Sequence, residues 1–218
     1  MFEKLFGGGQ PSTLIDAAFR DVSDMLEQSG RMLDHALAAL LDNEPLTVDL
    51  NAMDDRVDEG ERMVRRTVLE HLTLNPEQDL VASLVLASMV QDAERVGDFA
   101  RGLAELIPLA RGPRQGPFRD KLRDAANTLR PLFDLCRDAF HDDDPEKARR
   151  VLTVYTGLKD TLLHYTEEVA ASDLSADMAV VYAGAARILR RVGAHLSNIV
   201  SSVVQPYDRI RHGDEEAM

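Results

Sequence analysis

The sequence contains no tryptophan, and aromatic residues make up only 5% of its 218 residues. Sandwiches and barrels depend on aromatic and β-branched residues, so this scarcity argues against an all-β fold, and the abundant Ala, Leu, Arg, Asp and Glu favour helices. With Cys136 as the only cysteine, an internal disulfide is excluded. Cys136 lies in a helical pattern, LFDLCRDAF, so we expect a small buried hydrophobic side chain rather than a nucleophile.

Positive charge and long apolar runs are also scarce. The 25 Lys and Arg are outnumbered by 38 Asp and Glu, which gives a formal net charge of −13. Such a balance argues against binding to nucleic acid, because phosphate contacts need a basic face, and it suits cations or a basic partner. The most apolar run, Leu80 to Val90, falls short of the roughly 20 residues of a membrane-spanning helix. The N-terminal residues lack a secretory pattern, so we expect a soluble cytoplasmic protein.

Catalytic signatures are missing as well. The sequence has no Gly-x-Ser-x-Gly elbow, no dinucleotide-binding fingerprint and no phosphate loop after the triplet Gly7 to Gly9. Its six histidines are scattered, and none forms the Glu-x-x-His pair of a ferritin-like di-iron centre. We therefore expect a protein that is not an enzyme.

A short pattern occurs twice, at Glu94 to Asp98 (ERVGD) and at Arg190 to Ala194 (RRVGA). The two Val-Gly steps are 96 residues apart, close to half the chain, which indicates an internal duplication. The Gly- and Pro-rich segment at 111–117 lies near the midpoint, as a duplication requires.

Helical spacing of apolar residues predicts an all-α fold of six long helices, arranged as two tandem three-helix bundles. The expected organisation is a flexible arm at 1–11, a first repeat at 12–110, a linker at 111–117, a second repeat at 118–206 and a tail at 207–218. The helices are expected at about 12–41, 47–71, 76–110, 118–141, 146–171 and 173–205.

Local signals give expected ends for these helices. Pro131 predicts a kink or a break in the fourth helix, since proline removes a backbone donor and clashes with the preceding turn. The expected starting signals are Thr13 with Asp16, Thr47, Asn75 with Pro76, and either Asp173 or Ser175.

Two carboxylate pairs have the spacing of one helical turn: Asp54 with Asp58, and Glu94 with Asp98. If the second and third helices pack antiparallel, the pairs converge on one surface, where clustered oxygens suit a hard divalent cation or iron. A solvated acidic face is the alternative. Arg101, three residues after Asp98, would then relieve the repulsion without a metal.

These segments resemble the PhoU family. The Glu94 to Asp98 segment is similar to the Glu-Arg-Ile-Gly-Asp core of that family, whose repeats carry E(D)xxxD motifs, and Asp54 to Asp58 resembles the partner motif. The segment from Val192 to Ile199 is similar to the Ile-Gly-Asp-His-x-x-Asn-Ile form, with the aspartate missing. The resemblance covers nearly the whole chain.

The resemblance implies a non-enzymatic, negative regulator of phosphate uptake and of phosphate-starvation signalling. It implies an adaptor between the ATPase subunit of a phosphate transporter and a sensor histidine kinase, held near the membrane through the transporter. It also implies metal at Asp54, Asp58, Glu94 and Asp98, with iron, zinc, manganese or magnesium as candidates. The alternatives are an accessory protein of a different phosphate permease and a diverged helical metal-binding scaffold.

The second repeat departs from the family pattern. Tyr155 and Lys159 stand where the first repeat has Asp54 and Asp58, and Arg190 and Ala194 replace Glu94 and Asp98. We therefore predict at most one metal cluster, in the first repeat. The oligomeric state, including a homodimer, stays open.

Overall fold

The structure is a computed structural model, and it describes residues 13–210. The expected arm at 1–11 and the last eight residues of the expected tail lie outside this range. The described helices are α2 (Thr13–Leu41), α3 (Leu50–Leu74), α4 (Leu80–Ala104), α5 (Pro117–Leu129), α6 (Pro131–Asp142), α7 (Pro145–Ala170) and α8 (Ala176–Val204). Two short 3₁₀ helices, η1 (Ile107–Leu109) and η2 (Tyr207–Arg209), follow α4 and α8.

The predicted all-α fold is confirmed, and residues 13–210 contain no strand. Pro131 divides the fourth expected helix into α5 and α6, so the break predicted there is also confirmed. None of the helices within the described residues is both long and apolar enough to span a membrane.

Two of the expected helix starts are wrong. The N-cap of α3 is Asp49 instead of Thr47, because its carboxylate accepts bonds from the backbone N–H groups of Asn51 and Ala52. Asn75 is the C-cap of α3 and does not start the next helix, which begins at Leu80 after a turn.

Of three further helix ends, one differs from the expected position and two agree with it. The helix expected to reach residue 110 ends at Ala104, before η1. Thr13 is the first helical residue, and Asp16 pairs with Arg20 one turn later. Ser175 is the N-cap position of α8, as one of the two alternatives had it.

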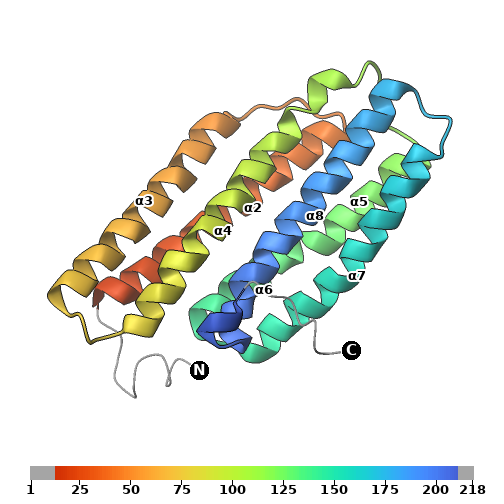
Figure 1. Cartoon of the computed structure of the whole chain (residues 1–218). Coiled ribbons are helices and arrows are strands. Elements are labelled where there is room, and N and C mark those ends of the chain that lie inside the picture. Colours follow the sequence, from red (N-terminus) through yellow and green to blue (C-terminus); the bar gives the residue numbers. More distant parts are fainter. Residues whose placement is uncertain (1–12, 211–218) are drawn as a thin grey trace.

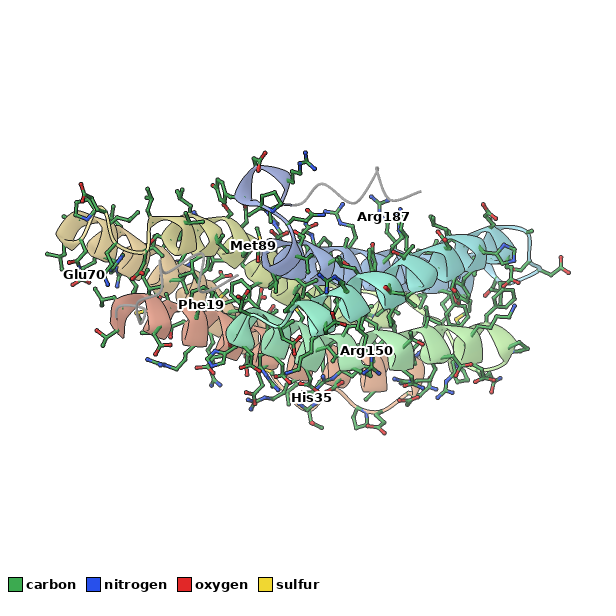
Figure 2. All side chains as sticks on the ribbon, turned by 90° about the horizontal axis from the view of Figure 1, so that it is seen from below. Phe19, His35, Glu70, Met89, Arg150 and Arg187 are labelled. Atoms are coloured by element: carbon green, nitrogen blue, oxygen red, sulfur yellow. The ribbon has the colours of Figure 1, made fainter. Side chains whose placement is uncertain are left out.

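The helices form two layers. In one layer α3, α4, α8 and α7 lie side by side in that order, and α2 with α5 and α6 lies behind them (Figure 1). The first bundle is α2, α3 and α4, and the second is α5 with α6, α7 and α8. The bundles meet where α4 packs on α8 and α2 packs on α6. In Figure 2, His35 of α2 and Arg187 of α8 lie on opposite sides of the molecule.

A continuous apolar core lies between the layers, and helical spacing puts its residues on one face of each helix. Val96 and Leu103 of α4 are fully buried. Cys136 is fully buried, and burial raises the pKa of its thiol. The prediction of a small hydrophobic role for Cys136 is thereby confirmed.

The two repeated glycines lie at close contacts between helices. A Cβ built on Gly97 of α4 would lie 3.1 Å from a methyl group of Val57 on α3. A Cβ built on Gly193 of α8 would lie 2.5 Å from the ring of Tyr155 on α7. The Val-Gly step therefore repeats because each bundle needs a residue without a side chain at this contact.

The C-terminus of α2 is capped by arginines of the following segment. Arg114 donates to the carbonyl oxygens of Ala39 and Leu40 at 2.6 Å, and Arg119 donates to that of Leu41 at 2.9 Å. The last carbonyls of a helix lack intrahelical partners and carry partial negative charge, so cations stabilise this end. The expected linker is therefore anchored to the first bundle.

The glycine contact generates a stability prediction. Gly193→Ala should lower the free energy of unfolding by about 1–2 kcal/mol, because the new methyl group displaces the Tyr155 ring from a filled site. Gly157→Ala, in α7 with no atom within 4 Å of the new methyl group, should raise it by about 0.5–1 kcal/mol. Urea unfolding of both variants measures these changes, and a stabilised Gly193→Ala protein would contradict the proposed packing.

Candidate functional site

The four predicted metal-binding residues lie on facing sides of α3 and α4. Asp54 and Asp58 are one turn apart on α3, and Glu94 and Asp98 are one turn apart on α4. All four side chains are partly exposed, from 14% for Asp54 to 37% for Asp58. The expected convergence of the two pairs is therefore seen, and we call these four residues with Glu61 the carboxylate cluster.

The negative charges of the cluster act on one another. The pKa of Glu94 is raised to about 7, first by burial and then by the charge of Asp98, with smaller effects from Glu61 and Asp58. Burial also raises the pKa of Asp54, in spite of the opposing effect of Arg101. Burial is thus the first cause of both shifts, and the neighbouring carboxylates add to it.

Arginines already lie beside each of the four candidate ligands. Arg62 is 3.8 Å from Asp58, and Arg95 is 3.0 Å from Asp98 and 3.6 Å from Glu94. These pairs stay on one helix, where partly exposed partners contribute little to stability.

Arg101 differs because it joins the two helices. Its Nε donates to Asp54 of α3 at 2.7 Å. Its two terminal nitrogens lie against residues of its own helix, Glu105 at 3.1 Å and Asp98 at 3.5 Å. Each of the three guanidinium nitrogens therefore faces a different carboxylate. The spacing of Arg101 and Asp98 could be read from the sequence, but the contact with Asp54, 47 residues away, could not.

The cluster has the right donor type for a hard cation but not the right arrangement. A metal ion needs several oxygens within about 2.0–2.6 Å of one point. Among residues 13–210, no group of three or more His, Cys, Asp or Glu side chains is placed to hold one. As arranged here the residues do not fit a metal ion, and the guanidinium group of Arg101 lies between their carboxylates.

The corresponding surface of the second repeat contains a tyrosine. The ring of Tyr155 lies over Gly193, and its hydroxyl donates to the carbonyl oxygen of Arg190 at 3.1 Å. By its contact with the repeated glycine, Tyr155 takes the place that Val57 has against Gly97 in the first repeat, and its alignment with Asp54 stays a prediction.

A second polar group, which the sequence interpretation missed, joins the two repeats. Asp92 of α4 is only 3% exposed, and it accepts hydrogen bonds at 2.8 Å from His195 Nδ1 and Asn198 Nδ2 of α8. The ring of Phe99 stacks on His195 and lies under the guanidinium group of Arg191. The His195-x-x-Asn198 spacing was visible in the sequence, but its buried partner 103 residues away was not.

The family model described as PhoU domain matches residues 22–107. A Thermotoga maritima protein named phosphate-specific transport system accessory protein PhoU homolog 1 is 28% identical over 194 residues, which cover 84% of this chain and 83% of that protein.

Two solved structures have a similar fold. PhoU from Pseudomonas aeruginosa matches with a TM-score of 0.81 at 20% identity, over 89% of this chain and 97% of that one. The phosphate transport system regulatory protein PhoU from Streptococcus pneumoniae matches with a TM-score of 0.79 at 16% identity, over 87% and 93% of the two chains. At these identities the structures establish the fold alone.

The raised pKa of Glu94 predicts a pH dependence in the metal-free protein. Glu94 holds its proton more tightly when folded, so its contribution to stability is complete below pH 4.5 and is lost as the pH rises to about 7. Glu94→Gln should therefore gain in Tm relative to the unsubstituted protein between pH 4.5 and 7.5. Thermal unfolding in a chelating buffer checks this. Glu70→Gln, at an exposed site on α3, controls for the loss of one charge.

The hydrogen bonds of Asp92 predict that removing this one carboxylate lowers the stability of the protein. Asp92→Ala leaves His195 and Asn198 without their shared acceptor, so the free energy of unfolding should fall by about 1–3 kcal/mol. Asp160→Ala, at an exposed site on α7, should change it by less than about 0.5 kcal/mol. Denaturant titration measures both, and equal effects would show that the network contributes nothing.

Proposed function

We propose that this chain, which belongs to the PhoU family, is an accessory and regulatory protein of a phosphate transport system. The observation that carries the proposal is the likeness, over 84% of this chain, to the Thermotoga protein, whose name describes an accessory protein of a phosphate-specific transport system. The PhoU domain matched at residues 22–107 and the fold shared along most of the chain also support it.

The proposed mode of action is contact with other proteins and not chemistry on a substrate. The protein would act in the cytoplasm, bound to the ATPase subunit of a phosphate transporter. It would signal the state of that transporter to a sensor histidine kinase. The carboxylate cluster and its arginines offer a surface of fixed charges, and such surfaces give protein contacts their specificity and speed of association. The proposed contacts do not require a metal ion at Asp54, Asp58, Glu94 and Asp98, whose arrangement does not fit one.

A gene deletion tests the proposal. In a host with an alkaline phosphatase reporter, the deletion strain grown in ample phosphate should show reporter activity several-fold above the parent, and the intact gene should restore repression. Uptake of labelled phosphate should be measured in the same cultures. An unchanged reporter with altered uptake would favour the runner-up, an accessory protein of a different phosphate permease. If neither changes, the proposed function is wrong.

Charge reversal on the proposed contact surface is a second test of the proposed function. Asp58→Lys, on the α3 side of the carboxylate cluster, should fail to restore repression because it inverts the charge offered to a basic partner. Asp160→Lys makes the same change at an exposed site on α7 and should restore it fully. Immunoblots for equal amounts of both variants exclude loss of the protein as the cause.

A further inference from the structure

We propose that Arg101 takes the place of a metal ion in the first repeat and holds α3 to α4 without one. The inference rests on the contacts of Arg101 within the carboxylate cluster and stands independently of the proposed function.

The position of the guanidinium group is the first argument. It lies among carboxylates from two helices, with Asp54 on one side and Asp98 and Glu105 on the other. A divalent cation held between the E(D)xxxD-like segments would need a place of this kind, between α3 and α4. A guanidinium group and a metal ion cannot occupy it together, since like charges repel at this distance.

The spread of the oxygens is the second argument. A guanidinium group is planar and larger than a metal ion, and each of the three nitrogens of Arg101 faces a different carboxylate. The oxygens around Arg101 are therefore held too far apart for one coordination shell, which agrees with the absence of a metal-competent group within residues 13–210. Metal binding would require Arg101 to leave and the carboxylates to move inward.

The partly buried contact with Asp54 is the third argument. The side chain of Asp54 is 14% exposed and that of Arg101 is 32% exposed, so their 2.7 Å bond is less screened than the pairs of Arg62 and Arg95. Since this bond links residues 47 positions apart, it stabilises the packing of α3 on α4 instead of a single helix.

The second repeat closes its helix contact in another way. The ring of Tyr155 packs on Gly193, so an aromatic side chain takes the place that Val57 has against Gly97. Arg190 and Ala194 replace Glu94 and Asp98 there, so α8 offers no such carboxylate pair to a metal ion or a guanidinium group.

The test compares three proteins stripped of metal by a chelator and then dialysed. Arg101→Gln removes the cation while keeping a side chain of similar length. Its Tm should fall by about 3 °C, because the carboxylates are left without their shared partner. Addition of 1 mM MnCl₂ should restore that Tm, and should leave the Tm of the unsubstituted protein within about 1 °C of its metal-free value.

Arg62→Gln is the matched control. It removes one positive charge from the same surface, but Arg62 bonds only to Asp58 and Glu59 of its own helix. Its Tm should not respond to Mn²⁺. Isothermal titration calorimetry should give a Kd for Mn²⁺ at least about tenfold lower for Arg101→Gln than for either other protein.

Two results would overturn the inference. An equal rise in Tm with Mn²⁺ for the unsubstituted protein and for Arg101→Gln would mean that Arg101 does not stand in the place of the metal. No rise for Arg101→Gln would mean that the position accepts no cation, and that Arg101 only forms a salt bridge.

Discussion

The close approach of α4 to α3 at Gly97 is the constraint on which the first repeat depends. Because Gly97 has no side chain, α4 packs closely against Val57 of α3 at this point. The polar positions one turn away on the two helices then face each other. Those positions carry carboxylates on both helices. The close apolar packing therefore also holds like charges near one another, which is electrostatically unfavourable. The raised pKa of Glu94 is the sign of this cost, and Arg101 offsets part of it.

The second repeat keeps the backbone contact and changes what surrounds it. Gly193 allows the same approach of α8 to α7, but the neighbouring positions are Tyr155, Arg190 and Ala194. A glycine contact is thus common to the two repeats, while the side chains beside it differ. The two bundles are then joined at Asp92, where a buried carboxylate of the first repeat binds two side chains of the second.

Much of this could be predicted from the chain. The apolar spacing predicted which face of α4 is buried, and the turn spacing of Asp54 with Asp58 and of Glu94 with Asp98 predicted a shared surface. Errors fell on local details such as Thr47 and Asn75, where several residues in a row can cap a helix and the packing of the loop selects one.

By itself the sequence determined the helices, the duplication and the acidic face, because periodicity and spacing are properties of neighbouring residues. The tertiary structure alone decided the partners of those residues. Arg101 lies within reach of Asp98 on any helix, but only the packing of α4 against α3 brings it to Asp54. Likewise, Asp92 finds His195 only after the two bundles have docked. Contacts between residues that are 47 or 103 positions apart in the sequence depend on how the helices pack. A pattern of neighbouring residues does not contain this information.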